Sequence, residues 1–214
     1  DILRTTLPGD DEMLNSLLSI VGRATARLSR LVNSLLDLRR LETGDVMLNR
    51  VPISPLDLVK EALEQVQPMA EAKSLQIQIV APANMPDVPL DVDMIRRVFI
   101  NLLDNAVKYT PQGGSVTVTL KTGRERLTVN VRDSGPGIPE GEQERIFNKF
   151  TRVQRDSAPQ GLGLGLAFCK LAIEAHGGRI WAETTLDRGA NFTFIVPIVP
   201  APVRPGVGPA QPVH

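Results

Sequence analysis

Apolar side chains recur at helical spacing through the first part of the chain, from Asp11 to about Thr43. Steps of three and four residues alternate, as in a heptad seam, at Leu14, Leu17, Val21, Ala24, Leu28, Leu31, Leu35 and Leu38. Leu18, Val32 and Leu36 widen this stripe toward that of a helix packed in a bundle. A helix of about thirty residues is long for a compact domain of this size. We therefore predict that the 11–43 helix packs against a second copy and forms a homodimer.

Beyond residue 44, alternating segments and helical segments follow one another. Alternation of apolar and polar residues predicts strands at 46–51, 75–80, 115–121, 127–132, 179–184 and 191–196. Helical spacing bounded by proline and glycine predicts helices from about Pro55 to Lys73, from Asp91 to Tyr109 and from Gly163 to His176. The proline-rich stretch 82–89 and the stretch 134–160 are predicted to be loops, the second of them mobile.

This order of elements, with strands paired through hairpins, predicts an α+β fold. We expect a two-layer α/β sandwich with a mixed sheet, one face of which packs against three helices, preceded by the long heptad-patterned helix. Residues 1–44 would form part of a helical dimerisation domain, in which 1–7 end a first helix and Pro8-Gly9 makes the turn. Residues 45–198 would form the globular domain, and 199–214 a disordered, proline-rich tail.

Composition narrows the classes of function. The 214 residues have a formal net charge of zero, so we expect no electrostatic attraction to nucleic acid or to acidic membranes. No apolar run is long enough to span a bilayer and no signal peptide opens the chain, which predicts a cytoplasmic location without membrane contact. The single cysteine, Cys169, excludes an internal disulfide. It lies in an apolar helical pattern that is typical of a small buried side chain rather than a reactive thiol.

Three polar residues share one face of the helix predicted from Asp91 to Tyr109. Asn101, Asn105 and Lys108 lie at i, i+4 and i+7. Amides that face a core are costly unless something hydrogen-bonds them, so this grouping predicts a bound ligand. An internal polar network is the alternative.

Two glycine-rich segments follow, Asp133-Ser-Gly135-Pro-Gly137 and Gly161-Leu-Gly163-Leu-Gly165. Glycine lets the backbone approach a ligand closely. The second segment opens a helix, whose first N–H groups and positive end attract phosphate. One glycine-rich segment is a weak indication, but two of them after a polar helix face predict a nucleotide site.

In this order the three segments resemble the N, G1 and G2 boxes of the ATP-binding domain of histidine kinases, within the superfamily that also holds gyrase and the mismatch-repair ATPases. Phe147-Asn-Lys-Phe150-Thr-Arg152 resembles the F box that lies between G1 and G2. The resemblance covers residues 95–196. It implies that 45–198 is the ATP-binding catalytic domain of a sensor histidine kinase, either soluble or the cytosolic part of a membrane-bound sensor.

The resemblance also implies roles for single residues. The Asp133 carboxylate would accept a hydrogen bond from the adenine amino group, beside Gly135, Gly137 and Ile138; a simple turn aspartate is the alternative. Asn101 and Asn105 would hold Mg²⁺, which prefers hard oxygen ligands and keeps several waters.

Phosphate contacts are implied for the remaining positions. Lys108 would meet a phosphate as a point charge, and Tyr109 would lie beside the adenine or else pack in the core. Arg152 would reach the γ-phosphate, whereas Arg155 would either do the same or stay exposed. The G2 positions that would line the phosphates are Gly161, Leu162, Gly163, Leu164 and Gly165. Phe147 and Phe150 would anchor the loop that contains them.

Neither histidine is preceded by a plausible acceptor motif. His176 stands in the last turn of a predicted helix, where a cation suits the helix dipole, and His214 lies in the tail. The chain is therefore expected to bind ATP without phosphorylating itself. One departure concerns the end of the domain, where the family often has Gly-x-Gly-Thr-x-Phe and this chain has Gly189-Ala-Asn191-Phe192. This change puts the affinity for ATP, rather than the fold, in question.

The implied activity is that of a protein-histidine kinase. Asn105, Lys108 and Arg152 would assist transfer of the γ-phosphoryl group of ATP to a histidine outside this chain, and a response-regulator aspartate would receive it next. One alternative is an ATP-driven conformational module of the same superfamily, against which the long N-terminal helix argues. Another is a module that dimerises without turnover, which only the altered terminal motif favours.

Overall fold

The computed structural model describes residues 12–44, 46–151, 162–184 and 189–198. The chain divides into two compact units, Asp1–Val46 and Met47–His214. The end of a first helix expected at 1–7 and the tail expected from residue 199 lie outside the described residues.

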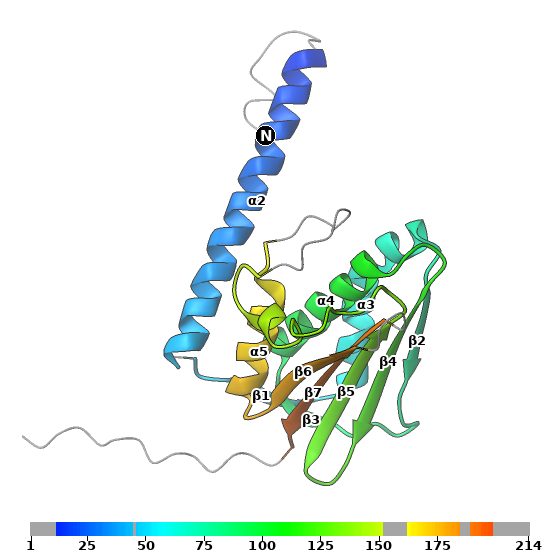
Figure 1. Cartoon of the computed structure of the whole chain (residues 1–214). Coiled ribbons are helices and arrows are strands. Elements are labelled where there is room, and N and C mark those ends of the chain that lie inside the picture. The colour runs from blue at the N-terminus through cyan, green and yellow to red at the C-terminus, as the bar shows by residue number, and fades with distance from the viewer. Residues whose placement is uncertain (1–11, 45, 152–161, 185–188, 199–214) are drawn as a thin grey trace, which may run out of the picture. The chain divides into compact units, whose positions relative to one another are not determined.

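The first unit contains the helix α2, Glu12–Thr43 (Figure 1). The long helix predicted from the heptad pattern is confirmed, and Arg40 in its last turn suits the negative end of the helix dipole. Large apolar side chains along α2 are at least 45% exposed at Leu17, Ile20, Val21, Leu28, Val32 and Leu36.

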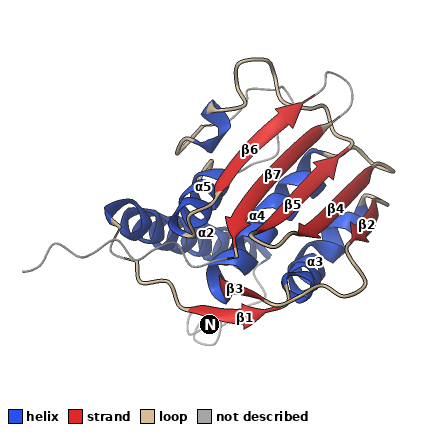
Figure 2. Cartoon of the chain, turned by 90° about the horizontal axis from the view of Figure 1, so that it is seen from below, coloured by secondary structure: helices blue, strands red, loops and turns tan. Residues whose placement is uncertain are grey.

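The second unit contains a five-stranded sheet in the order β2-β4-β5-β7-β6. Its strands are β2 Gln76–Val80, β4 Ser115–Thr122, β5 Arg126–Asp133, β6 Arg179–Thr184 and β7 Ala190–Pro197. β2 and β4 are parallel, and the other pairs are antiparallel. Three helices cover one face of the sheet (Figure 2): α3 Pro55–Ala72, α4 Val92–Tyr109 and α5 Gly165–Ala175. The predicted α+β sandwich with a mixed sheet is confirmed.

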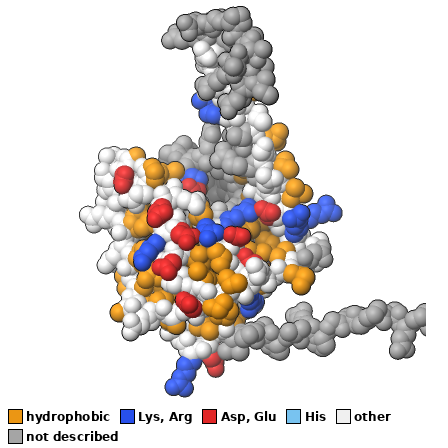
Figure 3. All heavy atoms as spheres, turned by 180° about the vertical axis from the view of Figure 1, so that it is seen from behind, with side chains coloured by type: hydrophobic (Ala, Val, Ile, Leu, Met, Phe, Trp, Pro, Cys, Tyr) orange, Lys and Arg blue, Asp and Glu red, His pale blue; other side chains and the backbone are white. Residues whose placement is uncertain are grey.

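The core lies between the sheet and these helices. Alternate residues of β4 and β5 are buried, which is the period-2 pattern of a sheet with one covered face. Phe99 of α4 meets Phe194 of β7 with ring centroids 5.6 Å apart. On the face of the molecule shown in Figure 3, acidic and basic side chains lie interspersed rather than gathered by sign.

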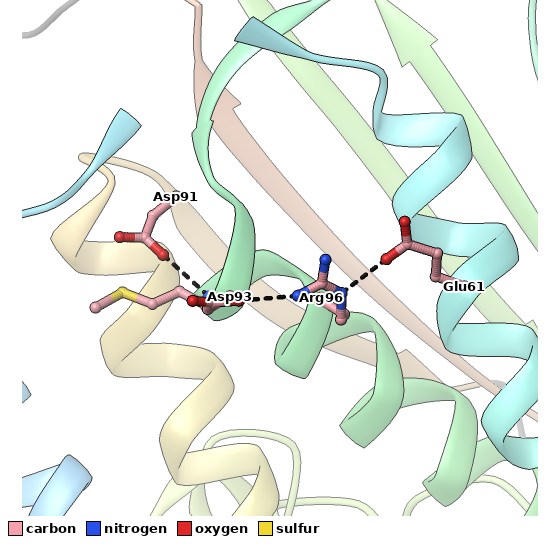
Figure 4. A network of polar contacts seen from close by, with 5 residues as sticks. Glu61, Asp91, Asp93 and Arg96 are labelled. Carbon is pink, nitrogen blue, oxygen red and sulfur yellow. Dashed lines mark hydrogen bonds and ion pairs between the residues drawn. The ribbon is translucent and has the colours of Figure 1, made fainter. Parts of the chain in front are cut away.

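Both ends of α4 are fixed by side chains from other elements or from its own cap. At its start Asp91 accepts a hydrogen bond from Met94 N (3.1 Å), and Arg96 lies between Asp93 and Glu61 of α3 at 2.8 and 2.7 Å (Figure 4). At its end Lys73 Nζ donates to the carbonyls of Val107, Lys108 and Thr110 at 2.7–3.0 Å. Carbonyls at a helix end lack hydrogen-bond donors within the helix. The Lys73 ammonium provides the missing donors.

One predicted strand and one predicted loop are partly wrong. The strand expected at 46–51 lies at β1, Arg50–Ile53, and it pairs antiparallel with β3, Val88–Asp91, whose first residues had been assigned to a loop. Pro89 of β3 lies opposite Pro52 in this small sheet. Proline cannot donate to a ladder, so the sequence of β3 resembles a loop even though the backbone is extended.

The 134–160 stretch is described only to residue 151. It contains a short 3-10 helix, η1 (Arg145–Phe147), in which Phe147 is buried and packs edge-on against Phe192 at 6.4 Å. The predicted anchoring role of Phe147 is confirmed. That of Phe150 is wrong, because its backbone φ is +61° and its side chain is 60% exposed.

No helix in the described ranges has the length and apolar character that a membrane crossing requires.

Candidate functional site

The structure brings the polar face of α4 against both glycine-rich segments. A Cβ atom on Gly135 would lie 3.0 Å from the carbonyl oxygen of Tyr109, and one on Gly165 would lie 3.0 Å from Oδ1 of Asn101. These separations are at the lower limit of ordinary Cβ contacts, so the absence of a side chain at both glycines allows the close approach. Segments that are far apart in the sequence therefore meet along one side of α4.

Asp133 ends β5 and is 5% exposed. Its Oδ1 accepts hydrogen bonds from Gly135 N (2.8 Å) and Ala190 N (3.3 Å), whereas Oδ2 has no hydrogen-bond donor among the described residues. Burial raises the pKa of the Asp133 carboxyl above its ordinary value, and the two backbone donors oppose that shift. One oxygen of a largely buried carboxylate thus remains for a ligand.

The polar row on α4 is half-buried at Asn101, Asn105 and Lys108. Asn101 lies beside Gly165 at the start of α5, and the Cys169 thiol on α5 donates to the Val98 carbonyl of α4 at 3.8 Å. In the described part of the chain, no protein group hydrogen-bonds the Asn105 side chain. The row therefore has one amide, Asn101, next to α5 and a second, Asn105, that a ligand could use.

Lys108 forms an ion pair with Asp104, whose side chain is 31% exposed. Asp104 is therefore not a separate solvated charge. The two residues are four apart on one helix, a spacing at which side chains meet. Lys108 is thereby held at the site, with a charge that Asp104 partly balances.

The donor set on α4 fits a hard divalent cation. The described residues contain no group of three or more His, Cys, Asp or Glu side chains that could hold a metal ion by themselves. Amide oxygens at Asn101 and Asn105 would suit Mg²⁺, which takes few protein ligands and fills its remaining positions with water and phosphate oxygens.

The start of α5 is shaped by Gly163 and Phe150. Gly163 has φ +67°, and its carbonyl accepts a hydrogen bond from Phe150 N at 2.9 Å. A Cβ on Gly163 would lie 2.9 Å from the Phe150 carbonyl carbon. Because of this left-handed residue, α5 begins at Gly165 rather than at Gly163 as predicted. Leu164 is buried, Leu162 is half-buried, and the first N–H groups of α5 follow.

Some of the predicted site residues fall elsewhere. Arg152, Arg155 and Gly161 lie outside the described residues. Tyr109 is 38% exposed. The alternative that it packs in the core is therefore wrong, and a position beside the adenine stays a prediction.

Cys169 matches its predicted character. It is fully buried, and burial raises the pKa of its thiol to about 12. The side chain is therefore a protonated, apolar neighbour of the site rather than a reactive group.

His176 is held in the neutral state. Its side chain is fully buried, Nδ1 lies 2.7 Å from the carbonyl of Ala172, and Nε2 accepts a hydrogen bond from Asp91 N at 3.1 Å. Burial lowers the pKa of His176. The expected cation at this helix end is therefore wrong. Both ring nitrogens are occupied by backbone groups, so His176 cannot serve as a phosphate acceptor in this fold.

Sequence reasoning missed Thr184. Its hydroxyl accepts a hydrogen bond from Ile138 N (2.9 Å) and donates one to the carbonyl of Gly189 (3.3 Å). The only signal in the sequence is a threonine at the end of an alternating strand, and such a threonine is common without any special contact.

Comparison with known proteins identifies similar sequences. Residues 90–200 match the family described as histidine kinase-, DNA gyrase B-, and HSP90-like ATPase. The chain is 38% identical over 173 residues to the adaptive-response sensory kinase SasA of Synechococcus sp. (strain JA-3-3Ab), an alignment that covers 80% of this chain and 46% of SasA. It spans about half the length of the curated relatives it matches.

Solved structures agree with this result. Full-length ShkA in complex with AMPPNP has a TM-score of 0.79 at 29% identity, covering 94% of this chain and 42% of ShkA. The catalytic domain of the histidine kinase ThkA has a TM-score of 0.64 at 30% identity, covering 72% of this chain and 98% of that domain. ThkA in complex with the response regulator TrrA has a TM-score of 0.68 at 27% identity, covering 93% of this chain and 56% of ThkA.

Proposed function

Because the chain belongs to the histidine kinase-, DNA gyrase B-, and HSP90-like ATPase family, we propose that it is the ATP-binding catalytic portion of a two-component sensor histidine kinase. Residues 45–198 would bind ATP, and residues 1–44 would belong to a dimerisation domain. We propose a cytoplasmic location, where ATP is supplied. The observation that carries the proposal is Asp133, a carboxylate buried to 95% of its surface whose second oxygen has no donor among the described residues.

The base would bind at Asp133. A carboxylate oxygen at a buried strand end accepts the amino group of adenine, and it has no hydrogen to offer the carbonyl of guanine. Gly135 and Gly137 would leave room beside the ring, and Ile138 and Tyr109 would contribute apolar surface. Burial strengthens such a hydrogen bond because the local dielectric is low.

The phosphates would extend along α4 toward the start of α5. Lys108 would contact them as a point charge, and the G2 segment would offer backbone N–H groups at the positive end of a helix. Asn101 and Asn105 would hold Mg²⁺, which when bound neutralises and orients phosphate charge. By the family resemblance Arg152 would meet the γ-phosphate.

In this scheme the chain contributes positioning and charge neutralisation rather than a covalent nucleophile. The acceptor would be a histidine on a separate helix, since both ring nitrogens of His176 are engaged with backbone. A response regulator would then take the phosphoryl group. The complex of the similar kinase ThkA with the response regulator TrrA supports such a partner.

A homodimer through α2 is part of the proposal. The exposed apolar side chains of α2 support it, because a stripe of this kind is typical of a surface that packs against another helix.

The proposed activity can be tested with the acceptor supplied separately. The chain would be incubated with magnesium and ATP labelled on the γ-phosphate, together with the histidine-bearing dimerisation domain of a SasA relative. We expect label on that histidine and none after Asn105→Ala. If ATP binds but no label is transferred, the chain would instead be a non-catalytic or ATP-driven module.

A further inference from the structure

One rung of the sheet holds both ends of the loop that would carry the adenine. Thr184 of β6 and Ala190 of β7 are register partners. Ala190 N donates to the Asp133 carboxylate at the start of the 133–138 loop, and the Thr184 hydroxyl accepts from Ile138 N at its end. Two neighbouring positions of one hairpin therefore fix the two ends of one loop.

The start of the loop is held very tightly. A Cβ on Gly189 would lie 1.7 Å from the carbonyl oxygen of Asp133, so the two backbones are in direct contact. The Asp133 side chain also fixes this end of the loop, because its Oδ1 accepts a hydrogen bond from Gly135 N. This end therefore depends on backbone contact with Gly189 and on the Asp133 carboxylate itself.

At the end of the loop, the Thr184 side chain binds the backbone N–H of Ile138. Thr184 Oγ1 accepts a hydrogen bond from Ile138 N at 2.9 Å and donates one to the carbonyl oxygen of Gly189 at 3.3 Å. The hydroxyl is therefore both an acceptor and a donor. Ala190, its partner across the rung, has no hydroxyl and offers only backbone. Of the two residues in the rung, Thr184 alone reaches Ile138 with a side chain.

The segment between these ends is flexible by composition. It contains Gly135 and Gly137, the second with φ +70°, and glycine loses more conformational freedom on ordering than other residues. Without the bond at Ile138, the loop would have more conformations to lose when a base binds. The phosphate-binding groups on α4 and α5 would not be affected, because they lie on other elements.

We propose that Thr184 is a positioning residue for base recognition: its hydroxyl fixes Ile138 and thereby presets the adenine side of the site. This inference rests on the proposed ATP-binding function. It differs from the role of Asp133, which would touch the base, since Thr184 acts through the loop.

The test compares Thr184→Val, which keeps the shape and removes the hydroxyl, with Thr184→Ser, which keeps the hydroxyl. Thr128→Val is the control, because Thr128 lies on β5, which β7 separates from the β6 strand of Thr184. Affinities for ADP and for inorganic tripolyphosphate would be measured by calorimetry. We expect Thr184→Val to weaken ADP binding about tenfold, with tripolyphosphate binding unchanged. Thr184→Ser and Thr128→Val should stay within about twofold of the unmodified chain.

Amide hydrogen exchange adds a second measurement, whose first part uses the unmodified chain alone. In the unmodified chain the Ile138 amide should exchange slowly, and it should exchange faster in Thr184→Val but not in Thr184→Ser. Rapid exchange at Ile138 in the unmodified chain would overturn the proposal. So would unchanged ADP binding by Thr184→Val, equal loss of ADP and tripolyphosphate binding, or failure of serine to restore binding. If the unmodified chain bound no nucleotide, the proposed function itself would be wrong.

Discussion

The Asn101 side-chain oxygen on α4 lies so close to Gly165 at the start of α5 that a Cβ added to this glycine would be 3.0 Å from it. The two helices whose residues are proposed to bind magnesium and phosphate thus meet where the Asn101 amide contacts a glycine. A larger residue at position 165 would have to displace the amide.

We predict that Gly165→Val weakens magnesium-dependent ATP binding about tenfold, because a branched side chain cannot share this space with Asn101. Calorimetric titration with magnesium, and again with a chelator, gives the magnesium-dependent part. Gly123→Val is the matched control, since a Cβ there meets nothing closer than 3.9 Å. Equal affinities for the two variants would show that Asn101 takes no part in binding.

Gly189→Ala should destabilise the fold. Gly189 has φ +84°, and its Cβ would overlap the Asp133 carbonyl oxygen at 1.7 Å. We expect a loss of about 3 kcal/mol in the free energy of unfolding, measured by urea denaturation. Gly113→Ala separates the two causes, because Gly113 has a similar φ of +73° in open space, and it should cost only about 1 kcal/mol. Equal losses would mean that strain, not overlap, dominates.

Lys73→Met should lower stability by about 2 kcal/mol, since the ammonium of this half-buried lysine serves three carbonyls at the end of α4. Lys60→Met is the control: within the described residues Lys60 pairs only with Asp57, and its side chain is 59% exposed, so its loss should cost less than about 0.5 kcal/mol. Urea midpoints of the two variants provide the comparison. A result for Lys73→Met as small as that for Lys60→Met would contradict the capping role.

His176 predicts a pH dependence of stability. Burial is the main cause of its lowered pKa, and the Arg50 guanidinium lowers it further against the opposing effects of Ala172 and Asp91. A histidine with a lower pKa in the folded chain binds fewer protons when folded. Its contribution is therefore complete above its ordinary pKa of 6.5 and falls as the pH drops below that value.

The slope from this one group is at most about 1.4 kcal/mol per pH unit. Urea denaturation at several pH values, with His176→Gln as reference, isolates it from the carboxyl groups. Identical pH profiles for the two proteins would contradict the buried neutral histidine.

Local patterns were sufficient for the regular elements. The heptad positions of α2, the apolar face of α4 and the alternation of β4 and β5 each repeat within one segment, and each element was predicted correctly. β3 was not, because it has four residues, contains Pro89 and takes its partner β1 from a distant part of the sequence. Strand pairs of this kind are specified by tertiary packing rather than by propensity.

The site was predictable where residue types are unusual and not where ordinary residues act through their neighbours. The asparagines of α4 and the glycines beside Asp133 are conspicuous in the sequence. Thr184, the pairing of Asp104 with Lys108 and the tautomer of His176 depend on which groups the fold brings within about 3 Å, the hydrogen-bond range. Phe150 is exposed and has a left-handed backbone, and sequence patterns reveal neither feature.

The most direct test of the proposed function is calorimetric titration of magnesium-ATP into the chain and into Asp133→Asn. An asparagine that keeps its oxygen toward Gly135 would turn its own N–H₂ toward the adenine amino group, so two donors would face each other. We expect binding by the unmodified chain and at least about a tenfold loss in the variant, with no loss of unfolding free energy, because a neutral amide is easier to bury than a carboxylate. Equal ATP affinity for both proteins, or no binding by either, would contradict an ATP site at Asp133.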